Sequence, residues 1–446
     1  MIKPNPDGVN LALITVDSLR ADHVGCYGYD RETTPNTDRL AADANVFTNA
    51  VAHACATRPS FPSILTSTHG MLYGGFDHLS EEQVPISVLL SEDGYATGGF
   101  HSNPYLSEQF GYARGFDTYS DQEEDPNFTS QIRRYVANNV SGPVHDILSW
   151  IHDKAEEHGG VDVGAYYENA TDLTDQVIQW TESVEEPWFV WAHYMDPHHP
   201  YVPPDEYQLF GQTHSRRRGV KLRQQVLEDP DSLSERDWSD LTDLYDAEIR
   251  YTDAEIGRLV EHFTDTTWIL TADHGEEFYE HGNFGHKNRF YEEHVHVPLI
   301  VDGDAAGFGQ HDHLVGLNDV PVTLLDAADV STPDTYRGRN LFDGDREAVI
   351  GGWGPETGSD PDRVRLMHRT PDRKFIYDTI DSTEELYDLS TDPEERENVF
   401  ADVDASNHID AVETFEEEIR ETARTTNAVE IDEDLQEQLR NLGYKE

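Results

Sequence analysis

Residues 9–17 read VNLALITVD, a largely apolar run of strand length that ends at an aspartate. Apolar residues on consecutive rather than alternate positions are typical of a central strand buried on both faces of a parallel sheet. Two later stretches repeat this pattern: residues 188–194 (WFVWAHY) and residues 268–271 (WILT), the latter leading into Asp273 and His274. The sequence therefore predicts three core strands, each followed by polar side chains.

The segments between these strands show helical periodicity. Apolar residues at positions 86, 89 and 90 precede Gly94, and residues 245–259 carry a longer pattern with spacings of three and four. Strands that alternate with helices predict an α/β fold with a large, mostly parallel sheet sandwiched by helices. We expect this main domain to span residues 1–330.

Further segments are expected to surround this core. Two acidic stretches with weak strand signals, at about 118–175 and about 205–238, are predicted to be insertions. Beyond residue 330 the pattern changes to short strands, such as residues 374–377, and to a helical tail at about 409–441. Residues 331–446 are therefore predicted to form a smaller C-terminal α+β subdomain.

The charge balance is strongly acidic. Lys and Arg number 32 against 88 Asp and Glu, a net charge of −56, and only six of the basic residues are lysines. Such a surface repels nucleic acid and anionic membranes, so no nucleic-acid partner is expected. Its self-repulsion is tolerable where salt shortens the screening length to about 3 Å, which indicates a halophilic source. Aromatic residues make up 10% of the chain and are spread along it, which argues against a disordered acidic protein.

The sequence gives no sign of a membrane or secretory segment. No run approaches 18 consecutive apolar residues, so no membrane span is expected. The stretch MIKPNPDGVN before the first strand lacks the long apolar region of a signal peptide, and we expect a cytoplasmic protein. Cys26 and Cys55 are too few for a disulfide framework or a tetrathiolate zinc site and are expected to be small buried residues.

The polar residues after the core strands are expected to converge. Ligands of open α/β sheets bind beyond the carboxyl ends of the strands, which here carry Asp17, residues 196–199, and Asp273 with His274. Two carboxylates and one imidazole from this set suit a divalent cation, although they leave its coordination shell incomplete.

A hydroxyl is available to complete that shell. Residues 57–66 read TRPSFPSILT, in which Thr57 precedes Pro59, a residue that favours the first turn of a helix. A hydroxyl beside both a cation and a helix N-terminus is suited to nucleophilic attack and to binding oxyanions. A threonine before a proline is also a common helix cap, and this reading stays open.

These stretches belong to a longer series of motifs in the chain. In order they are LITVDSLRADHVGCYGY (13–29), TPNTDRLA (34–41), TRPSFPSILTS (57–67), YMDPHHPY (194–201), TADHGEEFYEHGNFGH (271–286), VPLIV (297–301) and ELYDLSTDPEERENV (385–399). Together they resemble the sulfatase family, within the alkaline phosphatase superfamily, over most of the chain. The resemblance implies a metal-dependent hydrolase acting on sulfate or phosphate esters.

The resemblance implies roles for four residues. Asp17, Asp273 and His274 match metal-binding positions of the family, and Thr57 falls where its nucleophile stands and would also contact the metal. One divalent ion is implied, and Ca²⁺, Mn²⁺, Mg²⁺ and Zn²⁺ all suit carboxylate, hydroxyl and imidazole ligands.

The nucleophile motif departs from that of typical sulfatases, in which a Cys or Ser opening C/S-x-P-x-R is oxidised to formylglycine. Here a threonine stands at that place, Phe61 replaces the arginine of the motif, and Cys55 lacks the required spacing, so formylglycine is not expected. Ser18 also stands where sulfatases often have a second metal-binding aspartate, and residues 99–104 (GFHSNP) replace the segment whose Lys and His hold the sulfate. A plain threonine resembles the family's phosphotransferase and phosphodiesterase relatives.

Five further residues complete the predicted site. By resemblance, His198 matches a histidine that contacts the substrate oxyanion or leaving group, and His286 resembles a substrate-binding histidine; either can protonate a leaving oxygen. Arg58, His101 and Asn103 are expected to bind the substrate. A structural role for either histidine, beside a backbone carbonyl, and a surface salt bridge for Arg58 remain alternatives.

The sequence thus predicts a hydrolase of sulfate or phosphate esters, on small molecules or glycans, that works through a covalent Thr57 intermediate. Two alternatives stay open. One is a phosphoryl-group transferase resembling phosphoethanolamine and phosphoglycerol transferases, and the other is a catalytically silent protein that binds anionic esters. The sequence does not indicate an oligomeric state.

Overall fold

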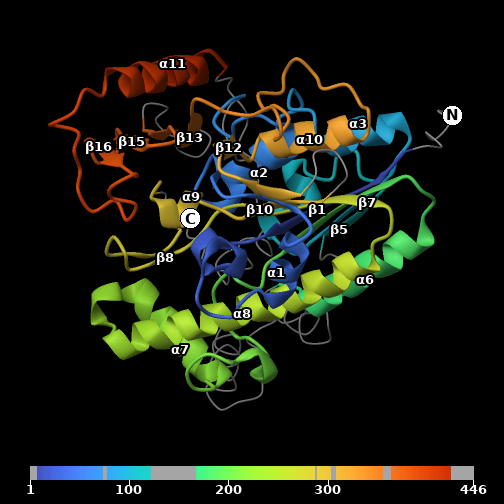
Figure 1. Cartoon of the computed structure of the whole chain (residues 1–446), viewed down its shortest axis with the longest axis horizontal. Helices are drawn as coiled ribbons and strands as arrows, with labels where there is room; N and C mark the ends of the chain where they lie inside the picture. Colours follow the sequence, from blue (N-terminus) through green and yellow to red (C-terminus); the bar gives the residue numbers. More distant parts are fainter. Residues whose placement is uncertain are drawn as a thin grey trace, which may run out of the picture.

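The computed structural model describes residues 8–73, 78–121, 167–286, 289–302, 308–354 and 363–422. At their centre lies an eight-stranded sheet with helices on both faces (Figure 1). In spatial order its strands are β11 (Gly309–His311), β2 (Asn45–Phe47), β10 (Leu299–Val301), β7 (Thr266–Ala272), β1 (Asn10–Val16), β6 (Trp188–Tyr194), β4 (Ala96–His101) and β5 (Thr118–Asp121).

Strand β1 lies in the middle of this sheet and is parallel to both of its neighbours. Leu11 pairs with Phe189 on β6 and with Thr267 on β7. All seven residues of β1 are buried, as expected for a strand covered on both faces, and each large aliphatic side chain removed from water contributes about 1.5–3 kcal/mol. Strand β10 runs antiparallel to β7 and β2. The predicted α/β fold with a mostly parallel sheet is confirmed.

Helices cover the two faces of the sheet (Figure 1). On one face lie α2 (Thr57–Thr66), α3 (Ile86–Asp93) and α10 (Asp319–Ala327), which contact one another. On the other face lie α1 (Pro35–Ala41), α6 (Ala170–Ser183) and the long α8 (Glu235–His262), with α1 and α6 both packed on α8. Helix α7 (Arg216–Glu228) packs on α8 as well.

Local sequence signals set the ends of two of these helices. The Ser234 hydroxyl accepts a hydrogen bond from the Asp237 N–H, and the Asp237 carboxylate accepts from the Ser234 N–H, a capping box that starts α8. Helix α3 ends at Gly94, whose φ of 99° lies in the left-handed region that glycine adopts without strain. Both predicted helices, before Gly94 and over residues 245–259, are therefore confirmed.

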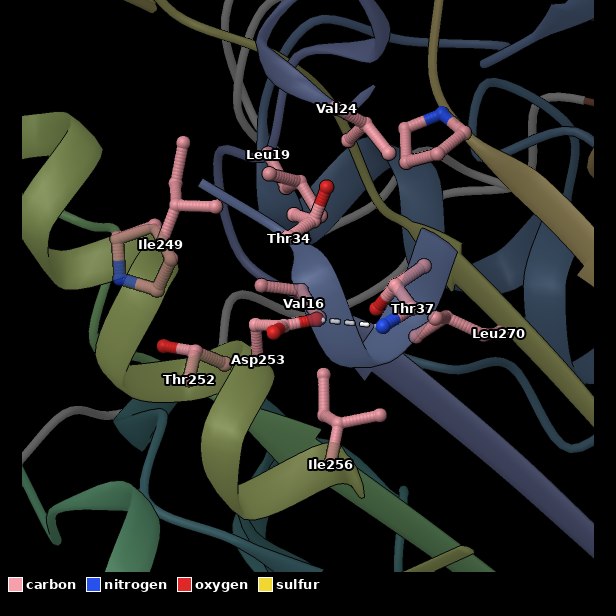
Figure 2. Close-up of a pocket in the computed structure, with 12 residues that line it drawn as sticks. Val16, Leu19, Val24, Thr34, Thr37, Ile249, Thr252, Asp253, Ile256 and Leu270 are labelled. Carbon is pink, nitrogen blue, oxygen red and sulfur yellow. Dashed lines mark hydrogen bonds between the residues drawn. The ribbon is translucent and has the colours of Figure 1, made fainter. Parts of the chain in front are cut away.

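A small pocket lies between β1, α1 and α8 (Figure 2). Its lining is mostly aliphatic, with Val16, Ile249 and Ile256 among its residues, and its volume is about 10 Å³, room for at most one water molecule. At its edge the Asp253 carboxylate accepts a hydrogen bond of 2.8 Å from the Thr37 N–H, the dashed line in Figure 2. This pocket is a packing gap between α1 and α8, and it is too small for an ester substrate.

The C-terminal part of the chain forms a second, antiparallel sheet. Its strands are β13 (Val349–Trp353), β14 (Arg365–Arg369), β15 (Arg373–Asp378) and β16 (Thr383–Asp388), and α11 (Ser406–Thr422) packs on it through Phe415 and Val412. The predicted smaller C-terminal α+β unit is thus present. The part of the predicted helical tail after residue 422 lies outside the described residues. The boundary at 330/331 remains a prediction.

The predicted insertions lie partly within the described residues. The stretch 205–238 contains α7 and the first turn of α8, whereas residues 122–166 of the other stretch lie outside the description. Short pairs of strands link loops elsewhere: β3 (Ala50–Val51) with β12 (Val315–Gly316), and β8 (Glu277–Phe278) with β9 (Phe284–Gly285). None of the described helices combines the length and apolar character needed to cross a bilayer.

A buried ionic cluster joins the second sheet to the rest of the molecule. Lys374 on β15 is 0% exposed, and its Nζ lies 2.7 Å from Glu395 Oε1 and 3.1 Å from Glu292 Oε1. Glu292 begins the short helix α9 (Glu292–Val295), and its other oxygen lies 3.2 Å from Arg369. Although burial acts to raise the pKa of Glu292, Lys374 and Arg369 hold it well below its usual range.

Candidate active site

Three predicted metal ligands meet at the carboxyl ends of β1 and β7. Asp17 follows β1, and Asp273 and His274 follow β7, so the parallel pairing of these strands brings them to one edge of the sheet. One ligand atom from each lies within 4.8 Å of the other two, and all three residues are 0% exposed. The sequence-based prediction that these residues come together agrees with the structure.

The orientation of the His274 ring fits a bound cation. Its Nδ1 lies 2.8 Å from the Gly275 carbonyl, which only accepts, so Nδ1 carries the proton and Nε2 presents a lone pair. That Nε2 faces carboxylate oxygens, 3.5 Å from Asp273 Oδ2 and 3.9 Å from Asp17 Oδ1. Within the described residues, Asp273 Oδ2 has no hydrogen-bond donor. Acceptors that face one another in a buried site are the arrangement that a divalent cation stabilises.

The charges of this site are unevenly distributed between the two carboxyls. Burial, together with the neighbouring Asp17, raises the pKa of Asp273 to about 8. Burial acts in the same direction on Asp17, but the imidazoles of His198, His193 and His274 hold its pKa well below the ordinary value. Two carboxylates this close repel each other, and a cation between them removes that repulsion.

Thr57 lies against this trio. It is the first residue of α2, and its hydroxyl donates a hydrogen bond of 3.2 Å to Asp17 Oδ2 and lies 3.4 Å from His274 Nε2. It is 1% exposed. The hydroxyl thus occupies the place between the metal-ligand set and the positive N-terminus of a helix.

Ser18 fixes the two carboxylates instead of adding a third. Its N–H donates to Asp273 Oδ1 at 3.3 Å, and its hydroxyl donates to Asp17 Oδ1 at 2.7 Å. Its φ of 57° is unusual for a residue with a side chain, and its carbonyl accepts a hydrogen bond of 2.6 Å from the Tyr245 hydroxyl. The strained turn therefore orients Asp17 and Asp273 toward each other.

Two predicted catalytic histidines lie beside the trio. The ring of His286 lies 4.7 Å from that of His274 and 5.2 Å from that of His198, measured between centroids. Burial acts to lower the pKa of His286, but the Glu276 carboxylate, 3.1 Å from its Nδ1, raises it above the ordinary value. Burial lowers the pKa of His198 to about 4. One imidazole is thus disposed to hold a proton and the other to lack one.

The three predicted substrate-binding residues have different surroundings in the structure. Asn103 lies at the trio, where its Nδ2 donates to Asp17 Oδ2 at 3.4 Å. The guanidinium of Arg58 lies over the ring of Tyr105, 4.5 Å from its centroid. His101 is 1% exposed and stacks on Trp191 at 5.5 Å, a packing that favours a core role for this ring.

Sequence reasoning missed His193, on β6. Its Nε2 lies 3.6 Å from Asp17 Oδ2, and its Nδ1 is hydrogen-bonded at 3.0 Å to the Thr15 hydroxyl. The only signal was a histidine inside an otherwise apolar strand. Asp196, expected to join the site, instead accepts a hydrogen bond from the Ala170 N–H at the start of α6.

Of the two cysteines expected to be buried, Cys55 is buried and Cys26 is half-buried. Cys55 is buried in an apolar cluster with Val51 and Val295, and burial raises the pKa of its thiol to about 12. Burial has the same effect on Cys26, whose pKa is also raised to about 12. Neither thiol is activated as a nucleophile.

Comparison with known proteins identifies the family of this chain. The family model described as Sulfatase matches residues 9–330. The arylsulfatase of Clostridium perfringens (strain 13 / Type A) is 24% identical, with 90% of this chain and 92% of that protein covered.

Two solved structures share the fold. One is a protein in complex with its substrate D-glucosamine-2-N,6-O-disulfate, with a TM-score of 0.69, 20% identity, and 96% of this chain and 100% of that chain covered. The other is the phosphonate monoester hydrolase of Agrobacterium radiobacter, with a TM-score of 0.68, 20% identity, and 96% and 98% covered. With the family model matching most of its length, this chain belongs to the sulfatase family of hydrolases.

Proposed function

We propose that this sulfatase-family hydrolase cleaves sulfate or phosphate esters through a covalent intermediate on Thr57. The observation that supports this most directly is the position of the Thr57 hydroxyl, 3.2 Å from Asp17 Oδ2 and 3.4 Å from His274 Nε2. A hydroxyl placed at a carboxylate–imidazole set and at a helix N-terminus is suited to attack sulfur or phosphorus. The substrates are small molecules or glycans, in keeping with relatives that act on such esters.

Asp17, Asp273, His274 and the Thr57 hydroxyl would hold one divalent ion, Ca²⁺, Mn²⁺, Mg²⁺ or Zn²⁺. When bound, such an ion supplies Lewis-acid polarisation of an ester oxygen and lowers the pKa of a bound hydroxyl. The Ser18 and Asn103 hydrogen bonds would keep the two aspartates in place for this role.

The reaction divides into two displacements. Thr57 Oγ1 forms a bond to sulfur or phosphorus while the bond to the leaving oxygen breaks, and its proton moves toward Asp17 Oδ2, the acceptor already in contact. His286, which Glu276 favours in its protonated form, protonates the leaving oxygen. Water then attacks the sulfur or phosphorus and gives a proton to His198, whose lowered pKa keeps it unprotonated beforehand. The bond from sulfur or phosphorus to Thr57 Oγ1 breaks, and the proton held by Asp17 returns to that oxygen, which restores Thr57 and releases sulfate, phosphate or, from a diester, a phosphate monoester. Arg58 would pair with the ester oxyanion.

The substrate class is tested by assaying nitrophenyl sulfate, phosphate monoester and phosphodiester side by side at high salt. We expect turnover of at least one ester, and the ratio of kcat/KM values assigns the preference. A plain threonine cannot release sulfate by collapsing to an aldehyde, which favours the phosphorus esters. Absence of turnover with all three, together with ester binding that survives Thr57→Ala, would instead identify a silent binding protein.

Metal removal is expected to abolish activity. Loss of an ion that neutralises the developing charge removes several kcal/mol of transition-state stabilisation, so turnover should fall at least about 10³-fold after chelation. Adding back a divalent ion should restore the wild type but not Asp273→Asn. Full turnover by protein that contains no metal in elemental analysis would contradict the proposal.

The acidic surface is expected to make stability depend on salt. With a net charge of −56, self-repulsion destabilises the compact state most where screening is weak. The screening length falls from about 10 Å at 0.1 M to about 3 Å at 1 M salt, so the free energy of unfolding should rise steadily over this range and beyond. Urea unfolding at a series of KCl concentrations measures this. A stability that is flat or falling with KCl would argue against adaptation to a saline cell interior.

A further inference from the structure

A group of side chains of metal-ligating types lies outside the proposed catalytic set. Glu277 is on β8, and Glu293 and His294 are on α9, so the group joins the β8–β9 hairpin to the following helix. One ligand atom from each residue lies within 4.8 Å of the other two. None of these side chains has a role in the reaction described above.

The imidazole of His294 is held in one orientation with its lone pair turned inward. Its Nε2 lies 3.1 Å from the carbonyl oxygen of Gly285, which only accepts, so Nε2 carries the proton. Nδ1 of the neutral ring is then an acceptor. The side chain of His294 is 0% exposed, and within the described ranges its Nδ1 has no hydrogen-bond partner.

The carboxylate of Glu277 shows the same pattern. Its Oε1 accepts hydrogen bonds from the N–H groups of His281, at 3.0 Å, and Asn283, at 2.7 Å. Its Oε2 is buried and, among the residues described, has no partner, although Glu277 is 0% exposed. An unsatisfied carboxylate oxygen and an unsatisfied imidazole nitrogen in one buried space cost free energy unless a donor or a cation lies between them.

Glu293 adds a third ligand and connects the group to solvent. Its Oε1 lies 2.7 Å from His281 Nδ1, and its side chain is 7% exposed. It lines a cleft of about 690 Å³ in which carboxylates such as Glu280 and Asp312 outnumber arginines. A negatively charged cleft that reaches Glu293 provides an entry path for a cation.

We propose that Glu277 Oε2, His294 Nδ1 and the Glu293 carboxylate bind a second divalent transition-metal ion, of which Zn²⁺ is the best match. One imidazole and two carboxylates are ligands of the borderline class that Zn²⁺ accepts, and three protein ligands leave a position for water from the cleft. The ion would tie α9 to the hairpin whose last residue, Gly285, precedes His286. The site is structural and does not depend on the proposed reaction.

The test counts Zn²⁺ per chain by elemental analysis after equilibration with Zn²⁺ and dialysis in concentrated KCl, which removes weakly held surface ions. We expect Glu277→Gln and Asp273→Asn each to hold one ion fewer than the wild type, and the double variant two fewer. Glutamine keeps the oxygen that accepts from His281 and Asn283 and offers an N–H toward His294 Nδ1, so the fold should survive. Glu394→Gln, the same change at an exposed residue of the cleft, should retain the wild-type number of ions.

The proposal would be overturned if Glu277→Gln bound as many ions as the wild type. It would also be overturned if the wild type bound a single ion that only Asp273→Asn removed. In either case water alone would bridge Glu277 and His294. If Glu277→Gln does not fold, crystals of the wild type grown with Zn²⁺ still decide, through the anomalous difference map at the zinc edge. A peak between Glu277 and His294 supports the site, and a peak confined to Asp17 and Asp273 refutes it. The Asp273→Asn variant reports separately on the ion at the proposed catalytic site. Failure of the catalytic proposal can therefore be distinguished from failure of the proposed second site.

Discussion

Thr57→Ala is expected to lower kcat/KM at least about 10⁴-fold, because removing a covalent nucleophile leaves only the contributions of binding and charge stabilisation. Thr57→Ser keeps the hydroxyl at the start of α2 and should retain measurable turnover. Both variants should keep wild-type secondary structure, since the alanine removes only a hydroxyl and a methyl group. Initial rates on the best ester of the side-by-side assay measure the effect.

The intermediate itself gives a second readout. After a rapid acid quench of a turnover reaction, mass spectrometry of the peptide that contains residues 57–66 should detect a sulfo or phospho group on Thr57. His286→Asn should slow formation of this adduct with substrates that have poor leaving groups more than with nitrophenyl esters, because the latter need little protonation. A modified residue elsewhere, or full activity in Thr57→Ala, would refute the assignment.

Lys374→Met is expected to destabilise the protein by about 3–5 kcal/mol, because it leaves buried carboxylates without their cation. The ammonium lies 2.7 Å from Glu395 and 3.1 Å from Glu292, and Lys374 is 0% exposed. Burial already raises the pKa of Glu395 to about 7 despite the neighbouring lysine, so further loss of positive charge leaves this carboxyl poorly compensated. Urea unfolding at one fixed KCl concentration measures the change.

Two further variants make this prediction specific. Lys221→Met removes a lysine from the exposed surface of α7 and should change stability by less than about 0.5 kcal/mol. The double variant Lys374→Met/Glu395→Gln should recover part of the loss, since the uncompensated charge is removed with its partner. Equal effects of Lys374→Met and Lys221→Met would show that the cluster contributes nothing beyond surface charge.

The sequence was most informative where one rule of sheet architecture applies. Apolar runs predicted β1, β6 and β7, and because parallel strands end at one edge, Asp17, Asp273 and His274 were expected to meet there. The start of a helix at Thr57 was a local signal, but its contact with Asp17 depends on how α2 packs on the sheet. That contact was expected only from the family resemblance.

Other features were beyond a pattern-based reading. His193 lies inside a strand whose apolar run predicts burial. The sequence pattern alone does not distinguish a histidine of the site from a histidine of the core at that position. Residues 374–377 were predicted correctly as a strand, but the ionic partners of Lys374 come from distant segments, so periodicity cannot identify them. Side chains that come together only through tertiary packing produce no periodic pattern in the sequence.

The central position of β1 has a consequence for synthesis. Leu11 pairs with Phe189, 178 residues further along, and with Thr267, later still. At translation rates of about 5–20 residues per second, this apolar strand leaves the ribosome roughly 10–40 s before its first sheet neighbour exists. The nascent chain must stay unaggregated during that interval, and abundant carboxylates along it would favour this through mutual repulsion.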